Sequence, residues 1–229
     1  MSGGKDSVRS YLERTKEMRS SPFAVTGAAR GLGLTIAAAI VESGADVFCC
    51  DILEAPSQPE WKALQAKAAK YNAIVRYYQV NIVDVEGVTS VFARIASESR
   101  VPINGFVGCA ATQDEQLAIN YDIPTFSRVM RINVDGTMVT AQAAARLMKD
   151  SGVGGSILMV ASMSGSIANR VSGQRGLIEK RREDKRPKLT VIIFRASSAP
   201  PIMRPKQLVI SCAVQWPWNG QSTRFESIL

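Results

Sequence analysis

A glycine-rich turn between a strand and a helix constrains this chain more than any other feature of its sequence. Residues 26–33 have the sequence Thr-Gly-Ala-Ala-Arg-Gly-Leu-Gly. They follow the apolar run Phe23–Thr26, which predicts a short strand, and they open a segment with helical periodicity that continues to Ser43. Glycines permit a tight turn whose N–H groups can approach an anion, and the positive end of the following helix dipole favours phosphate. The motif therefore predicts a phosphate-binding turn at the start of a β-α unit.

The chain continues this alternation for about 160 residues. Short apolar runs predict four further strands, and segments of helical periodicity separate them. The strands are expected at residues 46–50, 74–80, 103–107 and 156–161, and the later helices at 59–71, 85–97 and 124–149, the last as one long helix. Regular β-α alternation is typical of an α/β fold with a Rossmann-like, doubly wound parallel sheet and right-handed crossovers.

The alternation stops near residue 172, which divides the chain into three parts. Residues 1–21 form an N-terminal extension, 22–172 the predicted dinucleotide-binding domain, and 173–229 a basic tail. The first 169 residues carry 16 basic and 16 acidic side chains, so the net charge of +8 lies entirely in the last 60. The tail contains the apolar runs Leu189–Phe194 and Leu208–Val214, but they do not continue the alternation. We expect a poorly specified tail and a sheet that is incomplete at its C-terminal end.

An acidic residue follows the second predicted strand. Asp51 closes the run Asp46–Cys50, at a distance from the glycines that suits a carboxylate accepting from the ribose hydroxyls of a bound adenosine. A carboxylate at this position repels a 2′-phosphate and so favours NAD(H) over NADP(H). Arg30 acts in the opposite direction because a guanidinium beside the second glycine can hold that phosphate, so NADP(H) stays open. The alternative for Asp51 is a solvated loop acid.

The glycine-rich turn and the following acid resemble the short-chain dehydrogenase/reductase family, and further motifs occur in that family's order. The pair Asn81-Ile82 is similar to the Asp-Val pair that contacts the adenine, and 108–111, Gly-Cys-Ala-Ala, occupy the place of Asn-Asn-Ala-Gly, which only Ala110 matches. The cofactor-binding residues that this resemblance implies are Gly27, Arg30, Gly31, Leu32, Gly33, Asp51, Asn81, Ile82, Cys109 and Ala110.

Two further matches concern catalysis. Asn133 resembles the helix asparagine whose carbonyl holds a proton-relay water, and Ser162 resembles the serine that hydrogen-bonds the substrate carbonyl. Residues 162–170 are most similar to the polyol dehydrogenase/ketose reductase group, which implies NAD(P)-dependent oxidoreduction of a secondary alcohol or ketone such as a polyol or ketose. Alternatively, Asn133 satisfies backbone groups between helix segments, and Ser162 is an ordinary hydroxyl at a strand end.

The family's Tyr-x-x-x-Lys pair, the source of its general acid/base, is absent. All five tyrosines precede Ser162, so turnover by the chain as written is doubtful. We hypothesise that the tail is translated out of frame. In the shifted frame the Trp216-Pro217 codons must give Ala and those of Trp218-Asn219 must give Glu, and residues 201–206 permit Tyr-x-x-x-Lys. The sequence would then contain a gene-model error.

Composition excludes several other classes. The chain has no histidine, which rules out Ser-His-Asp and Cys-His nucleophiles and HExxH zinc sites, and we expect no metal. Its four cysteines lack framework spacing and no apolar run spans a bilayer, so we expect reduced thiols, a cytoplasmic location and no membrane partner.

The predicted partner is a small alcohol or ketone, and the family is typically homo-oligomeric. Two alternatives stay open: a non-catalytic dinucleotide-binding protein, and a nucleic-acid binder that uses the basic segment 170–206. The second is disfavoured because that segment lacks interleaved aromatic residues, and we expect no nucleic acid.

Overall fold

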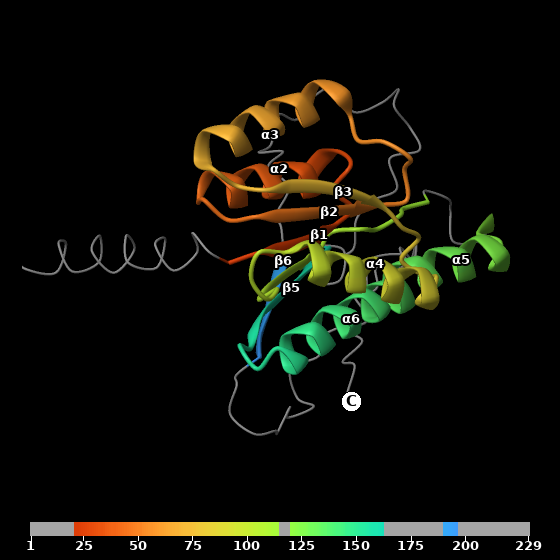
Figure 1. Ribbon diagram of the computed structural model, residues 1–229. Coiled ribbons are helices and arrows are strands. Elements are labelled where there is room, and N and C mark those ends of the chain that lie inside the picture. Colours follow the sequence, from red (N-terminus) through yellow and green to blue (C-terminus); the bar gives the residue numbers. More distant parts are fainter. Residues whose placement is uncertain (1–20, 115–119, 163–189, 197–229) are drawn as a thin grey trace, which may run out of the picture.

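A six-stranded sheet with helices on both faces forms the body of the protein (Figure 1). A computed structural model describes residues 21–114 and 120–162 and, for its backbone, 190–196. The strands are β1 (Phe23–Thr26), β2 (Val47–Asp51), β3 (Val75–Gln79), β4 (Gly105–Gly108), β5 (Gly155–Ala161) and β6 (Thr190–Ala196). Their order in the sheet is β3-β2-β1-β4-β5-β6. The first five strands pair in parallel, which confirms the predicted Rossmann-like sheet.

The last strand is a departure from the sequence prediction. The apolar run Leu189–Phe194 was assigned no element, yet β6 pairs with β5 over seven residues, from Gly155 opposite Ala196 to Ala161 opposite Thr190. This pairing is antiparallel, so the sheet is mixed at this side. Part of the segment expected to be poorly specified therefore adds a strand. The remainder of 173–229 and most of the extension 1–21 lie outside the described residues.

The helices divide between the two faces of the sheet (Figure 1). One face carries α2 (Gly31–Glu42) and α3 (Gln58–Tyr71), and the other carries α4 (Val85–Glu98) and α6 (Thr137–Asp150). Before α6 the chain forms α5 (Ile123–Met130) and a π-helical segment, η2 (Arg131–Gly136). The prediction of one long helix over 124–149 was therefore wrong in its middle, where a π segment replaces α-helical turns.

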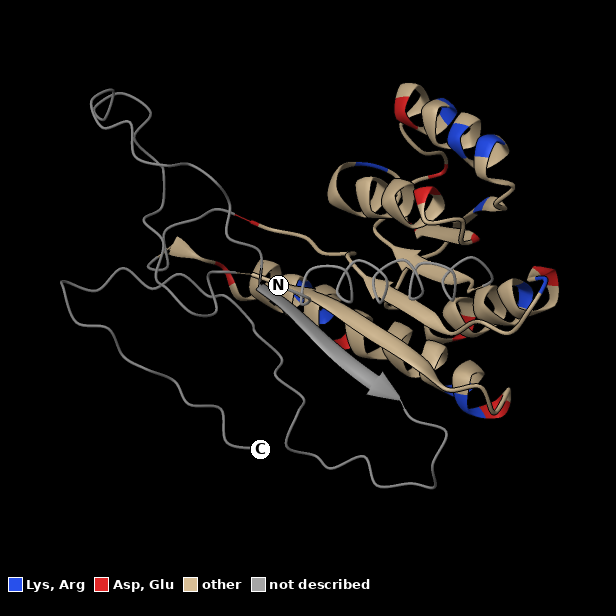
Figure 2. Cartoon of the chain, turned by 90° about the vertical axis from the view of Figure 1, so that its left-hand side faces the viewer, with Lys and Arg blue, Asp and Glu red and all other residues tan. Residues whose placement is uncertain are grey.

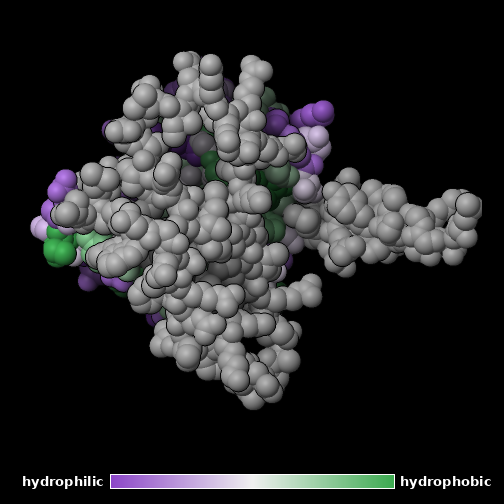
Figure 3. Space-filling view, turned by 180° about the vertical axis from the view of Figure 1, so that it is seen from behind, coloured by the Kyte–Doolittle hydropathy of each residue, from purple (hydrophilic) through white to green (hydrophobic). Residues whose placement is uncertain are grey.

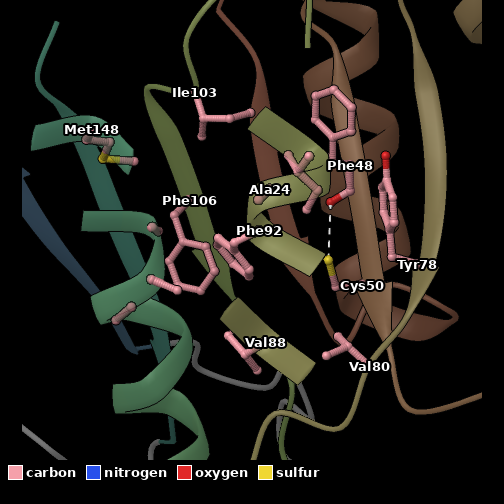
Figure 4. Close-up of a cluster of buried hydrophobic side chains, with 14 of the residues drawn as sticks. Ala24, Phe48, Cys50, Tyr78, Val80, Val88, Phe92, Ile103, Phe106 and Met148 are labelled. Atoms are coloured by element: carbon pink, nitrogen blue, oxygen red, sulfur yellow. Dashed lines mark hydrogen bonds between the residues drawn. The ribbon is translucent and has the colours of Figure 1, made fainter. Parts of the chain in front are cut away.

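Each face of the sheet has its own hydrophobic core. On the α4/α6 face, Phe48, Phe92 and Phe106 are fully buried, and the rings of Phe92 and Phe106 have centroids 6.1 Å apart (Figure 4). On the α2/α3 face, Trp61 packs against Tyr77 at 5.7 Å. Each fully buried side chain of this size contributes about 1.5–3 kcal/mol. The two cores hold the strands in register, and that register fixes where the loops at the strand ends lie.

The carboxyl ends of β1, β2 and β4 meet at one edge of the sheet, the carboxyl edge. Thr26, the last residue of β1, lies opposite Cys50 in β2 and Gly108 in β4. The loops that follow these strands are therefore neighbours, although the sequence separates them by tens of residues. In parallel α/β sheets ligands bind at this edge, where the strand order reverses.

The opposite, amino edge is held by an ion pair. Asp46, just before β2, is buried and accepts from the Nε of Arg100 at 2.9 Å and also from its Nη2. The same carboxylate accepts from the N–H of Ile74 at 2.7 Å, and Arg100 donates to the carbonyl of Asn72 at 3.2 Å. Asn72 ends α3 in a left-handed conformation. One carboxylate thus joins the starts of β2 and β3 to the end of α4.

Charged and apolar residues are distributed differently over the described surface. Charged residues lie mainly on the helices and loops outside the sheet (Figure 2). Apolar residues also reach the surface (Figure 3), and Leu32, Ile52 and Leu53 are exposed beside the glycine-rich turn and Asp51. Within the described part of the chain, no helix is long and apolar enough to cross a membrane.

Candidate functional site

Two of the three glycines in the turn after β1 are enclosed by protein. Gly27 has φ +68°, and a Cβ there would lie 2.7 Å from the nitrogen of Ala110, in the loop after β4. A Cβ on Gly33 would collide with the carbonyl oxygen of Gly27. These two glycines let α2 pack tightly on the turn and let the turn pack on the β4 loop. Both positions therefore serve packing within the protein.

The middle glycine faces open space instead. Gly31 has φ +58°, and a Cβ built on it would find no atom within 4 Å. It begins α2, whose N-cap residue, Arg30, is extended and exposed and provides no side-chain cap for the first turn. The first N–H groups of a helix need acceptors, and the helix dipole makes this end positive. A phosphate can thus approach the backbone at Gly31, which none of the described atoms obstructs.

Asp51 is tied to the glycine-rich turn. It is the last residue of β2, and its two carboxylate oxygens accept from the N–H of Ala29 at 3.0 Å and from that of Leu53 at 3.2 Å. The first contact joins the end of β2 to the turn after β1, as does the bond from the N–H of Ala28 to the carbonyl of Cys50 at 3.2 Å. Asp51 is thus an ordered, half-buried acid, unlike a solvated loop residue. An ionised carboxylate offers about four acceptor sites, and the described residues fill two of them with these two N–H groups.

The loop after β4 packs against the same turn. The N–H of Cys109 donates to the carbonyl of Thr26 at 3.2 Å, and the N–H of Ala110 lies 3.4 Å from its hydroxyl. Cys109 is half-buried, and burial raises the pKa of its thiol to about 11, so the thiol is neutral at physiological pH. Cys109 and Ala110 therefore lie beside Gly27, and their backbone N–H groups hold this loop against the end of β1. Thr26, which the predicted set of binding residues omitted although the motif contains it, accepts both of these hydrogen bonds.

The pair predicted to contact an adenine lies in the loop after β3. Asn81 is exposed, and its side-chain oxygen accepts from the N–H of Val83 at 3.3 Å, while its carbonyl accepts from that of Asp84 at 3.0 Å. Ile82 is buried. Asp84 then caps α4 by accepting from the N–H of Gly87 at 3.1 Å. The loop after β3 is thus a tight turn anchored to α4. It lies at the carboxyl edge of the sheet, as the glycine-rich turn does.

Asn133 lies inside the π segment η2 and holds the loop after β4. Its side-chain amide donates to the carbonyl of Thr112 and accepts from the N–H of the same residue, both at 2.8 Å. The side chain thus satisfies backbone groups, but these belong to a loop 21 residues earlier and not to the junction between helix segments that the alternative interpretation named. The role predicted for the Asn133 carbonyl concerns a different atom. A π segment also marks functional sites in many helices because it interrupts the regular hydrogen-bond ladder.

Ser162 directly follows β5 and is exposed, at the carboxyl edge where the loops after β1, β2, β3 and β4 also lie. Residues 163–170, which carry the polyol-dehydrogenase resemblance, lie outside the described residues, as do residues 201–206 of the frame hypothesis. No group of three or more His, Cys, Asp or Glu side chains suited to a metal ion occurs in the described ranges.

Comparison with known proteins decides the family. The family model described as short chain dehydrogenase matches residues 23–173, which is more than half of the chain. The chain belongs to this family. This match confirms the resemblance stated from the motifs.

Known relatives include enzymes that act on polyols. The protein is 38% identical over 146 residues to "Short chain dehydrogenases/reductase notP'" of Aspergillus versicolor, covering 64% of this chain and 50% of that one. It is 34% identical over 148 residues to galactitol 2-dehydrogenase (L-tagatose-forming) of Cereibacter sphaeroides, covering 64% and 54%. Among solved structures, a short chain dehydrogenase from Mycobacterium paratuberculosis bound to NAD superposes with a TM-score of 0.57 and 25% identity, covering 64% and 57%. This short-chain dehydrogenase thus spans about half the length of the curated relatives named here.

Proposed function

We propose that this protein is an NAD(P)-dependent oxidoreductase that interconverts a secondary alcohol and a ketone, with a polyol or ketose as substrate. The observation that carries the proposal is the contrast among the three glycines: Gly27 and Gly33 are closed by protein, whereas Gly31 faces open space beside an ordered acid, Asp51. The positive φ of Gly31 favours glycine in any turn, but its open space lies at a helix start beside Asp51, which gives a ligand access to the backbone there. A pyrophosphate needs a close approach to backbone N–H groups at a helix start.

The residues at the carboxyl edge suit a nicotinamide dinucleotide. Gly31, Leu32 and the start of α2 would receive the pyrophosphate, and the open acceptor sites of Asp51 would take the ribose hydroxyls of the adenosine. Asp51 disfavours a 2′-phosphate, so NAD(H) is the proposed cofactor; exposed Arg30 is the residue that would support NADP(H). The NAD-bound mycobacterial relative supports this assignment, as does the family. The cofactor supplies hydride exchange.

The chain's own residues would orient the substrate. The Ser162 hydroxyl would donate to the substrate oxygen and so polarise the carbonyl. The Asn133 carbonyl would hold a water for proton relay, while its side chain keeps the loop after β4 in place. No tyrosine follows Ser162 in the sequence, so the family's general acid is absent there. Loss of a general acid typically lowers the rate by about 10² to 10⁴.

A second function, a non-catalytic dinucleotide-binding protein, is favoured by that missing tyrosine. The two functions share the binding site and differ only in turnover. A polyol or a ketose is the substrate to test first, because the relatives include galactitol 2-dehydrogenase. Turnover of galactitol or of a ketose above the background of heat-denatured protein supports the oxidoreductase, and tight binding with no turnover supports the second function.

Binding of NADH and NADPH, measured by isothermal titration calorimetry on the full chain, tests the proposal. The chain should bind NADH more tightly than NADPH, and Asp51→Asn should shift this ratio toward NADPH by about tenfold, because it removes the repelling charge. Glu54→Gln is the matched control: it removes one negative charge from an exposed position three residues further along and should leave the ratio unchanged. A folded chain that binds neither nucleotide would refute the proposal.

A further inference from the structure

The π segment η2 is in close contact with the loop after β3. Gly136, its last residue, is buried, and a Cβ there would lie 2.6 Å from Cγ1 and 2.7 Å from Cδ1 of Ile82, and 3.2 Å from Cγ1 of Val83. Carbon atoms in contact normally lie about 3.5–4.0 Å apart. Only glycine at position 136 therefore lets the segment come this near to the loop that contains Asn81 and Ile82.

The other contact of η2 is with the loop after β4. Asn133, three residues before Gly136, makes both of its side-chain hydrogen bonds to the backbone of Thr112. The same six-residue segment thus touches two loops of the carboxyl edge, one by close packing and one by paired hydrogen bonds. These loops follow strands β3 and β4, which are separated in the sheet by β2 and β1. The sheet itself does not bring them into direct contact, whereas η2 bridges them.

The glycine is unfavourable for the helix that contains it. In a helix interior, glycine costs about 1 kcal/mol relative to alanine. The Gly136 carbonyl accepts from the hydroxyl of buried Thr140 at 3.0 Å, so the segment is ordered despite the glycine. Ile82 is only 7% exposed, so its side chain has little room to swing away from an added methyl group. Helix propensity alone would favour alanine, and the close approach to Ile82 is what opposes it.

We propose that Gly136 is a positioning residue of the dinucleotide site. Its contact with Ile82, together with the Asn133–Thr112 pair, fixes the position of the loop after β3 relative to the loop after β4. The inference rests on the proposed function, because its effect is expressed through dinucleotide binding. A methyl group at position 136 must push η2 and the loop after β3 apart by roughly 1 Å to restore a normal carbon–carbon distance. Displacements of this size are enough to disrupt a precisely fitted ligand site.

A double-mutant cycle on the full chain, with NADH titrated calorimetrically, tests the inference. Gly136→Ala should weaken NADH binding about tenfold. Ile82→Ala removes the atoms that the new methyl group meets, so the double variant Gly136→Ala/Ile82→Ala should bind at least threefold more tightly than the product of the two single effects predicts. Multiplicative single effects would overturn the inference, because two independent sites would behave in that way.

Gly105→Ala provides a matched control. A Cβ there collides with the side chain of Phe23 at the start of β1, at the amino edge of the sheet and on the opposite side from the proposed site. It should lower the melting temperature but leave the NADH dissociation constant of the folded protein unchanged. If Gly105→Ala weakens binding as much as Gly136→Ala does, the effect reflects general destabilisation and the inference fails. If the parent chain does not bind NADH, the proposed function fails first, and the two failures are thus distinguishable.

Discussion

Replacing Gly31 with alanine should separate binding from folding. Gly31 and Gly152 share two properties: φ is +58° at the first and +73° at the second, and a Cβ at either would find no atom within 4 Å. They differ in location, because Gly31 starts α2 at the carboxyl edge and Gly152 follows α6, just before β5 and at the amino edge. The two substitutions therefore impose a similar kind of backbone strain, a positive φ, at opposite edges of the sheet.

The expected change in stability follows from that strain. A non-glycine residue in the left-handed region costs about 1–2 kcal/mol, and both variants should lose this amount of unfolding free energy. For a chain of this size each kcal/mol corresponds to about 2–4 °C in melting temperature. Neither variant introduces a steric overlap, so larger losses are not expected. Differential scanning fluorimetry without nucleotide provides the comparison.

Binding should distinguish the two variants. The methyl group of Gly31→Ala would occupy the open space through which a pyrophosphate approaches the backbone. NADH affinity should fall at least tenfold, or about 1.4 kcal/mol, whereas Gly152→Ala should bind like the parent. Equal affinities for the two variants would refute the assignment of Gly31 as the glycine that faces the ligand. A much larger melting shift for Gly31→Ala would show instead that protein atoms occupy the space.

Two further predictions concern the amino edge and the core. Arg100→Met leaves the Asp46 carboxylate, which is 6% exposed, without its ion-pair partner. Urea titrations should show an unfolding free energy lower by about 1–3 kcal/mol. This loss is smaller than for a fully buried pair because Arg100 is half-exposed. An unchanged urea midpoint would contradict that role. Burial, with a smaller contribution from Asp51, raises the pKa of Cys50 to about 12. An unfolded thiol ionises near its ordinary pKa while the native thiol stays neutral, so stability should fall as pH rises from about 8.5 toward 12. Cys50→Ala should make this fall less steep in melts between pH 8.5 and 10.5, while the buried Cys49 thiol and the half-buried Cys109 thiol, whose pKa values are also raised, continue to contribute to it. An identical slope would count against the prediction.

The alternation of strands and helices could be predicted because each element carries its own local pattern. The strand Phe23–Thr26 has the predicted bounds, and the helix expected at 85–97 extends one residue further. The glycine-rich turn, Asp51 and the β4 loop lie at one edge because β1, β2 and β4 are parallel. The elements could be predicted from periodicity alone, whereas the members of the candidate site were named from the family resemblance.

The contacts between distant segments could not be predicted. A π segment in the middle of a long helix leaves the apolar periodicity nearly intact, so Arg131–Gly136 was expected to continue an ordinary helix. The pairing of Asp46 with Arg100 joins residues 54 positions apart, and no local signal marks either partner. The antiparallel placement of β6 likewise depends on which sheet edge is free, which one apolar run does not reveal.

The positions of these residues make dinucleotide binding and turnover physically separable. The proposed cofactor contacts come from the loops after β1, β2, β3 and β4, and η2 joins the last two of these loops. Both cores and the Asp46–Arg100 pair that support these loops also lie within residues 21–162. Ser162 is the one residue of the proposed catalytic machinery that follows β5, and no tyrosine follows it in the sequence. Substitutions at Gly31 or Gly136 should therefore change NADH affinity whether or not the chain turns over, and a failure of catalysis alone would leave the assignment of the binding site intact.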